Sequence, residues 1–309
     1  MDSPAASWTE RARRVPRLEG VPLAAWTTLR IGGPAAEFYQ PRRPEDLAAL
    51  LDHLEERELP WRMLGGGANV LAPDGGVRGA VIQTEGLRGV FREGERGLRA
   101  WAGASLPGLV HSAAGLGLAG LEPLAGVPGQ LGGALAMNAG SAEWGIWSVV
   151  REAVLWDPEA AGPGPERIRA VGPEEIGPRY RDGRLGRAVV LEVLLELQPS
   201  TPARVRAAVR ERIARKNASQ PVSLATAGCA FRNPPGDSAG RLLEAAGLKG
   251  RRRGRAVFSG LHANFVVNEG GATAAEVRAL LEEAREEVEG RFGIRLRPEL
   301  VIWPEPLPE

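Results

Sequence analysis

Residues 121–140, which read LEPLAGVPGQLGGALAMNAG, constrain the fold of this chain more than any other segment. Five glycines lie within the segment and Gly120 precedes it, so an ordinary core helix or strand over this length would be costly. Such a backbone can instead approach a ligand closely and point its bare N–H groups at an anion. Residues 64–71 (LGGGANVL) have the same character. Two such segments, closing on Asn69 and Asn138, predict an extended groove for a long diphosphate ligand.

The composition is that of an ordinary globular protein, with 43% hydrophobic and 25% charged residues in 309. This length suits two or three subdomains. The net charge of +1 gives no bulk attraction to nucleic acid or membrane, so we expect neither as a partner. One cysteine allows no internal disulfide, and three scattered histidines predict no metal site. The polar, basic start and the lack of a long apolar run lead us to expect a cytoplasmic protein.

Strand, glycine turn and helix alternate irregularly along the chain, which favours an α+β fold over a doubly wound sheet. Residues 1–20 are expected to be a loose arm and residues 198–202 a linker, with the strongest domain break near residue 200. Thr273 and Glu276 predict a capping box before a long helix. The expected helices are 44–58, 106–114, 203–216, 238–246 and 274–292. The expected strands are 61–64, 78–84, 89–92, 98–103, 149–156, 188–197, 256–258, 263–267 and 300–303.

Residues 115–120 (GLGLAG) match the G-x-G-x-x-G pattern of dinucleotide-binding proteins. That fingerprint needs a strand before it and a helix after it. Here the glycines are expected to end a helix, at Gly115, and more proline and glycine follow. A Rossmann dehydrogenase is therefore an alternative that this sequence favours less.

Cys229 lies in the segment AGCAFRNPPG, and a lone cysteine is usually an inert buried residue. Here Gly228 precedes it, a turn-forming Asn-Pro-Pro-Gly follows, and Arg232 is close by. A free thiol has a pKa of about 8.5, so Cys229 is mostly protonated at neutral pH and can donate a proton. A nucleophilic role stays open, although no histidine lies nearby in sequence to activate the thiol. By residue type alone, Tyr180-Arg181-Asp182 reads as a surface tripeptide and Glu299 as a solvated carboxylate.

Seven segments span nearly the whole chain: TTLRIGG, LGGGANVL, GLEPLAGVPGQLGGALAMNAG, YRDG, AGCAFRNPPG, LHANFVVN and RPELVIW. Together they resemble the UDP-N-acetylenolpyruvoylglucosamine reductase (MurB) family in its shorter form. The resemblance implies an FAD-binding fold of the vanillyl-alcohol-oxidase (PCMH) type. Its two subdomains would be residues 1–83 with 299–309 and residues 84–198. A C-terminal α+β substrate-binding domain would comprise residues 199–298.

The resemblance also implies which residues hold the cofactor. FAD would bind non-covalently, with its diphosphate along the two glycine-rich segments. The expected FAD contacts are Leu64, Gly65, Gly66, Gly67, Ala68, Asn69, Val70, Gly126, Val127, Pro128, Gly129, Gly132, Gly133, Ala134, Asn138, Ala139 and Gly140.

The activity that the resemblance implies has two halves, in which NADPH and the sugar nucleotide share one site in turn. NADPH reduces the flavin, and a hydride then passes from flavin N5 to C3 of the enolpyruvyl ether of UDP-N-acetylglucosamine. The product would be UDP-N-acetylmuramate, a precursor of peptidoglycan. Arg181 and Glu299 match the family positions that stabilise the charge on C2 and the adjoining carboxylate. Cys229 stands at the position of the proton donor to C2, where many relatives carry serine.

The expected substrate contacts are Tyr180, Lys216, Arg232, Asn233 and Asn264. Relatives often carry lysine where this chain has Ser219 and arginine where it has Val301, so whether Lys216 replaces the missing lysine stays open. We expect a monomer. Two further alternatives are a flavin-dependent oxidase or dehydrogenase with another small substrate, and a non-catalytic sugar-nucleotide-binding protein that keeps the fold.

Overall fold

The computed structural model describes residues 7–305, which form two compact units. The first unit comprises residues 7–19, 37–66 and 79–213, and the second comprises residues 20–36, 67–78 and 214–305. The chain therefore passes between the units several times. The expected division into residues 1–83 with 299–309, 84–198 and 199–298 stays a prediction.

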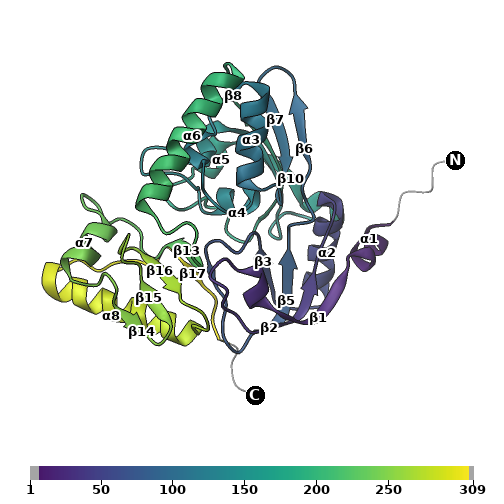
Figure 1. Ribbon diagram of the computed structural model, residues 1–309. Coiled ribbons are helices and arrows are strands. Elements are labelled where there is room, and N and C mark those ends of the chain that lie inside the picture. The colour runs from purple at the N-terminus through teal and green to yellow at the C-terminus, as the bar shows by residue number, and fades with distance from the viewer. Residues whose placement is uncertain (1–6, 306–309) are drawn as a thin grey trace. The chain divides into compact units, whose positions relative to one another are not determined.

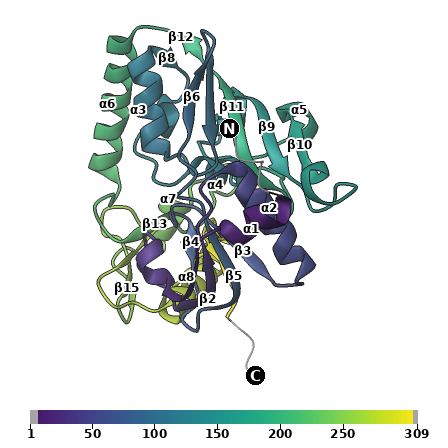
Figure 2. The ribbon, with the colours of Figure 1, turned by 90° about the vertical axis from the view of Figure 1, so that its right-hand side faces the viewer.

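A five-stranded antiparallel sheet, in the order β10-β9-β11-β7-β6, forms the centre of the first unit (Figure 1 and Figure 2). Its strands are β6 (Val90–Glu93), β7 (Gly97–Trp101), β9 (Val150–Trp156), β10 (Ile168–Val171) and β11 (Val189–Glu196). Helices α3 (Leu106–Leu116) and α4 (Leu131–Ala136) belong to the core on one face, with Val190 and Val193. Helix α2 (Pro44–Glu56) packs with Val189 and Leu191 on the other face.

A second sheet runs in the order β1-β2-β5-β3. Its strands are β1 (Arg17–Pro22), β2 (Pro34–Tyr39), β3 (Trp61–Leu64) and β5 (Val77–Gln83), of which β3 and β5 are parallel. Because β3 ends at Leu64, the first glycine-rich segment begins where this strand leaves the sheet. The short elements of the first unit are α5 (Pro173–Ile176), β8 (Leu118–Ala119), η2 (Glu122–Leu124), η3 (Ile146–Val149) and η4 (Gly164–Arg167).

The second unit contains an antiparallel sheet in the order β13-β16-β15-β14. Its strands are β13 (Thr226–Cys229), β14 (Arg252–Arg253), β15 (Ala256–Phe258) and β16 (Phe265–Asn268). Helices α7 (Ala239–Ala245) and α8 (Ala274–Phe292) form a core with this sheet. The predicted capping box of Thr273 and Glu276 is present at the start of α8. The unit also contains η1 (Leu23–Trp26) and a parallel pair, β4 (Val70–Leu71) with β17 (Val301–Ile302).

Several expectations about the connections were wrong. Residues 7–20 are not loose, because α1 (Trp8–Arg14) and then β1 form there, while residues 1–6 lie outside the described part. The expected linker contains β12 (Gln198–Pro199), which pairs with β8, and leads into α6 (Pro202–Ser219). Helix α3 continues past Gly115 and is capped by Gly117 at φ +69°.

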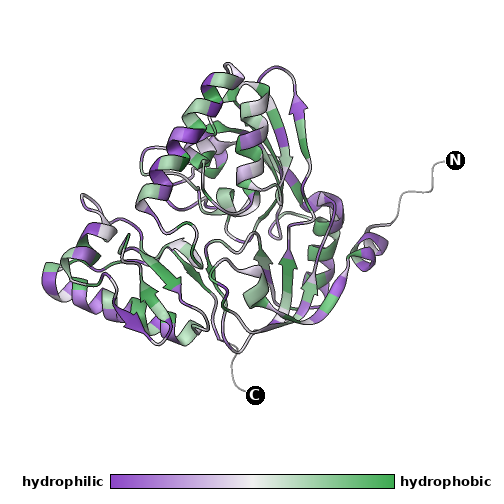
Figure 3. Cartoon of the chain, viewed as in Figure 1, coloured by the Kyte–Doolittle hydropathy of each residue, from purple (hydrophilic) through white to green (hydrophobic). Residues whose placement is uncertain are grey.

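Helix α6 buries less than its sequence pattern predicts. Helical periodicity places Val205, Ala208, Val209 and Ile213 on one apolar face, but only Val205 is buried, and Ile213 is 37% exposed. Hydrophilic positions run along the whole helix (Figure 3). None of the helices in residues 7–305 is long and apolar enough to cross a membrane.

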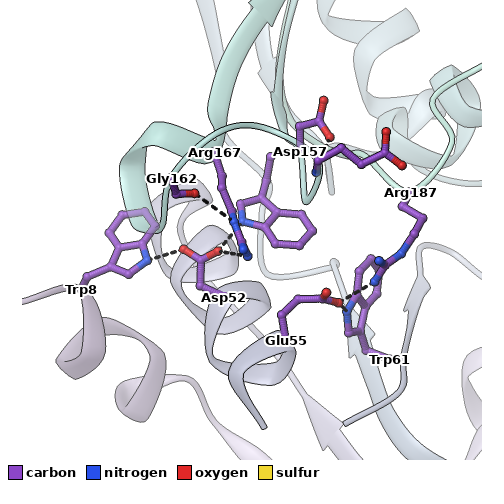
Figure 4. A network of polar contacts seen from close by, with 10 residues as sticks. Trp8, Asp52, Glu55, Trp61, Asp157, Gly162, Arg167 and Arg187 are labelled. Carbon is purple, nitrogen blue, oxygen red and sulfur yellow. Dashed lines mark hydrogen bonds and ion pairs between the residues drawn. The ribbon is translucent and has the colours of Figure 1, made fainter. Parts of the chain in front are cut away.

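A buried carboxylate in the first unit holds α1 in place. Asp52 on α2 is 4% exposed and accepts three hydrogen bonds (Figure 4). Trp8 Nε1 donates to Oδ2 at 2.6 Å, while Trp156 Nε1 and Arg167 Nη1 donate to Oδ1 at 2.9 and 3.0 Å. One side chain therefore joins α1, β9 and η4 to α2.

We expect Asp52→Ala to lower the free energy of unfolding by about 2–4 kcal/mol, because it leaves buried donors without an acceptor. Urea denaturation of the two proteins measures this difference. The control is Glu55→Ala on the same helix, whose carboxylate binds Trp61 Nε1 and Arg187 closer to solvent. There the expected loss is below about 1 kcal/mol. Equal losses of unfolding free energy in Asp52→Ala and Glu55→Ala would contradict the role of the buried Asp52 carboxylate in holding α1.

Candidate functional site

The two glycine-rich segments meet in the first unit. A Cβ atom on Gly66 would lie 3.0 Å from the Gly129 Cα, and one on Gly65 would lie 3.4 Å from Gln130 Oε1. Buried Thr84 donates from Oγ1 to Gln130 Oε1 at 2.5 Å. Neither Thr84 nor Gln130 was among the predicted site residues. The position of Gln130 in the second glycine-rich segment is the sequence signal that could have identified it. The two segments therefore lie against each other at Gly66 and Gly129, while the predicted groove for a diphosphate ligand stays a prediction.

Backbone donors are available along these segments. Within the described residues of the first unit, the N–H groups of Gly66, Gly129 and Gly133 donate no hydrogen bond. Successive bare N–H groups form concavities that bind phosphate oxygens. A side chain at Gly66 would press against the second segment. Both properties fit the diphosphate of a dinucleotide.

The first glycine-rich segment continues into the second unit at Gly67, which has φ +61°. A Cβ atom there would lie 2.1 Å from the carbonyl oxygen of Trp26. The Gly67 carbonyl accepts from the Thr28 backbone N–H at 3.1 Å. The segment TTLRIGG therefore supports the turn, and only glycine fits at its centre.

Arg181 is attached to the end of the second glycine-rich segment. Its Nη1 donates to the carbonyl oxygen of Gly140 at 2.8 Å, and its own backbone is left-handed at φ +56°. Asn138 Nδ2 donates to the Arg179 carbonyl at 2.9 Å, which fixes the same turn. The Arg181 guanidinium lies over the Tyr180 ring, 5.4 Å from its centroid. The structure thus brings Arg181, Tyr180 and Asn138 together in the first unit.

Cys229 and Glu299 lie on adjoining backbones in the second unit. Cys229 is the last residue of β13, and the carbonyl oxygen of the next residue, Ala230, accepts from the Glu299 N–H at 2.8 Å. Asn69 Nδ2 donates to the Glu299 carbonyl at 3.1 Å, and the Val301 N–H donates to the Asn69 carbonyl at 3.0 Å. Two residues that are far apart in sequence are thereby held side by side with the first glycine-rich segment.

The other expected substrate contacts also lie in the second unit. Asn233 Oδ1 accepts from the Ala239 N–H at the start of α7. Lys216 lies in the last turn of α6, and Arg232 is half-buried three residues after Cys229. The amide of Asn264 is bound to the backbone of Phe231. Their contacts with a substrate stay predictions.

The segment GLGLAG does not form a dinucleotide fingerprint. Gly115 lies inside α3, Gly117 caps that helix, and the two-residue strand β8 follows. A fingerprint needs the reverse order, with a strand before and a helix after. The Rossmann alternative is therefore wrong. In the described part of the chain, no group of three or more His, Cys, Asp or Glu side chains could hold a metal ion.

His262 lies in the second unit, two residues before Asn264, and its side chain is held in the neutral form. Burial lowers the pKa of His262 below its ordinary value, nearby Lys249 adds to this, and Glu244 opposes it. The ring accepts at Nδ1 from the Asn264 N–H at 3.2 Å, a hydrogen bond that protonation of Nδ1 would abolish. The neutral ring therefore supports the backbone at Asn264.

We expect the free energy of unfolding to fall as the pH drops below about 6.5, because the unfolded state then binds a proton that folded His262 resists. Urea titrations at pH 7.5 and 5.5 measure the change. In the variant His262→Gln, the free energy of unfolding should change less between pH 7.5 and 5.5 than in the parent. If both proteins show the same pH dependence, His262 is not its source.

The sequence matches models of two known domains. An FAD binding domain matches residues 35–159, and the C-terminal domain of UDP-N-acetylenolpyruvoylglucosamine reductase matches residues 220–303. UDP-N-acetylenolpyruvoylglucosamine reductase 2 of Symbiobacterium thermophilum is 42% identical over 293 residues, which cover 94% of this chain and 92% of that protein. The reductase of Alkalilimnicola ehrlichii is 44% identical over 284 residues, covering 91% and 92%.

A solved structure agrees with the sequence relatives. The crystal structure of UDP-N-acetylenolpyruvylglucosamine reductase (MurB) from Thermus caldophilus matches with a TM-score of 0.78 and 36% identity, and covers 94% of this chain and 99% of that one. The α+β class and the flavin-binding fold of the vanillyl-alcohol-oxidase type are confirmed, as is FAD as the cofactor. The chain therefore belongs to the UDP-N-acetylenolpyruvoylglucosamine reductase family and is an FAD-dependent oxidoreductase.

Proposed function

We propose that this protein reduces the enolpyruvyl ether of UDP-N-acetylglucosamine to UDP-N-acetylmuramate in peptidoglycan precursor synthesis, with NADPH as the hydride donor. The observation that carries the proposal is the 42% identity, over 94% of the chain, to a protein named as that reductase. The monomeric state and the cytoplasmic location stay predictions.

The two glycine-rich segments would hold the FAD diphosphate through backbone N–H groups such as those of Gly66, Gly129 and Gly133. Bound FAD would supply the hydride-transfer chemistry that links NADPH to C3 of the enolpyruvyl group. The close contact between Gly66 and Gly129 supports this role, because a side chain at Gly66 would push the two segments apart.

Arg181 and Glu299 would stabilise the charge that develops on C2 and the adjoining carboxylate when C3 receives the hydride. Arg181 suits this task because its guanidinium and its turn are both attached to the second glycine-rich segment. Glu299 would act protonated or paired with a cation, since an ionised carboxylate alone would repel the same charge.

Cys229 would complete the reduction by donating its proton to C2. The hydride at C3 and the proton at C2 together saturate the double bond, and the thiolate then regains a proton from solvent. A thiol is a stronger acid than the serine hydroxyl of many relatives, so it can perform the same transfer.

Tyr180, Lys216, Arg232 and Asn233 would bind the sugar nucleotide. A diphosphate needs cationic partners, and Lys216 would supply one where this chain has Ser219 in place of the lysine of many relatives. NADPH would use the same site before the sugar nucleotide enters it.

Anaerobic titration tests the proposed function. The purified protein should be yellow, lose its flavin colour with NADPH, and recover it when the enolpyruvyl sugar nucleotide is added. Reduction by an alcohol or hydroxy acid, with no response to NADPH, would favour the other flavoenzymes of this fold. A protein that takes up no FAD would contradict the proposal and favour a binding protein.

A further inference from the structure

The backbone that follows Cys229 is held by the side chain of Asn264. This asparagine is 2% exposed. Its Oδ1 accepts from the Phe231 N–H at 2.9 Å, and its Nδ2 donates to the Phe231 carbonyl at 2.8 Å. Its backbone carbonyl accepts from the Ala230 N–H at 2.7 Å. One residue thus provides three hydrogen bonds to the two residues after the thiol.

The sheet by itself does not fix the direction of Cys229. Thr226 pairs with Val267 and Cys229 pairs with Phe265, so β13 has one extra residue between these pairs. Gly228, at φ +80°, lies in this irregular step. Because a slip of one residue turns a side chain to the opposite face, the register beyond the bulge decides where the sulfur points.

The hydrogen bonds from Asn264 also affect the spacing between the backbones at Cys229 and Glu299. The Ala230 carbonyl accepts from the Glu299 N–H, so Ala230 is held by Asn264 on one side and by Glu299 on the other. A shift of this segment would therefore move the thiol and the carboxyl group together.

We propose that Asn264 is the positioning residue for the proton donor, because its amide holds Phe231 so that the Cys229 thiol keeps its register and its spacing from Glu299. The inference rests on the proposed function for the identity of the proton-transfer step. An amide side chain offers a donor and an acceptor together, as the buried N–H and C=O groups of Phe231 require. An apolar side chain would leave both groups unsatisfied.

The single cysteine of the chain gives a direct readout, since iodoacetamide labels only Cys229. In the FAD-loaded protein, Asn264→Ala is expected to raise the rate of alkylation by roughly tenfold, because a loosened backbone opens more often. Asn264→Asp keeps the acceptor for the Phe231 N–H and loses the donor to its carbonyl. Its effect should lie between the parent and the alanine variant, and it serves as the test protein if Asn264→Ala does not fold.

The two half-reactions provide the second readout. Reoxidation of the reduced flavin by the enolpyruvyl substrate should slow by roughly 10²-fold in Asn264→Ala, the cost of displacing a reacting group by about 1 Å. Reduction of the flavin by NADPH should keep the parent rate, since it does not use the thiol. A purely structural defect would slow both half-reactions alike.

Asn268 provides the matched control. It is also a buried asparagine of the second unit, with Nδ2 donating to the Leu29 carbonyl at 2.9 Å and Oδ1 accepting from the Ala272 N–H at 2.9 Å. We expect Asn268→Ala to lose stability while alkylation and reoxidation stay at parent rates.

Folded Asn264 variants that label and reoxidise like the parent would overturn the proposal, as would equal changes in Asn268→Ala. The proposed function can fail separately. If the parent shows no substrate-driven reoxidation but Asn264→Ala still alters labelling, the hold on Cys229 is supported and the assigned reaction is wrong.

Discussion

Cys229→Ala is expected to slow reoxidation of the flavin by the enolpyruvyl substrate by about 10²–10⁴-fold, the usual contribution of a positioned general acid. Reduction by NADPH should be unchanged, because hydride transfer to the flavin needs no proton from this thiol. Stopped-flow absorbance of the flavin, recorded separately for each half-reaction, measures both rates.

Cys229→Ser is the control for this prediction. Serine retains a donor of similar size at the end of β13, so we expect it to keep substantial turnover. Reoxidation at the parent rate in Cys229→Ala would show that another group protonates C2. The proton-donor role would then pass from the thiol to a different residue.

Gly67→Ala is expected to abolish FAD retention and to lower the free energy of unfolding by about 2–4 kcal/mol. The new Cβ would lie 2.1 Å from the Trp26 carbonyl oxygen, and the residue would keep φ +61°. A backbone oxygen cannot move aside cheaply, so the turn itself must change. Flavin absorbance after gel filtration and urea denaturation measure the two effects.

Gly247→Ala separates backbone strain from crowding. Gly247 also lies in the second unit, has φ +76°, and has no atom within 4 Å of a built Cβ position. We expect a loss of only about 1 kcal/mol with FAD retained. If Gly67→Ala behaves like Gly247→Ala, the close contact with Trp26 does not determine the conformation of the first glycine-rich segment.

Long, strongly patterned elements could be predicted from the sequence. Helix α2 has Leu47, Leu50 and Leu54 on one face, and α8 begins with a capping box, so local signals agree with the tertiary structure in both. The glycine-rich segments were predicted only in part, because residues Leu131–Ala136 of the second segment form helix α4 despite their two glycines. Helix α1 was missed because its seven residues are mostly polar and depend on the distant Asp52.

The site was harder to predict, because its residues are placed by backbone partners that are distant in sequence. Arg181 is attached to the Gly140 carbonyl, and Glu299 is held through Ala230. By residue type alone, Arg181 and Glu299 were interpreted as surface residues. Only the family resemblance selected them as site residues. Asn264 was expected among the polar substrate contacts. Its contacts with the backbone after Cys229 could not be predicted, because the bulge before Cys229 leaves no trace in a single sequence.

The pairing of β4 with β17 affects the order of events during synthesis. Val70 and Val301 stand opposite each other although more than two hundred residues separate them. The segment around Asn69 is made early, but it has no partner strand until residues 301–302 have been synthesised. The turn after β3 therefore takes its final form only when both members of this distant pair are present.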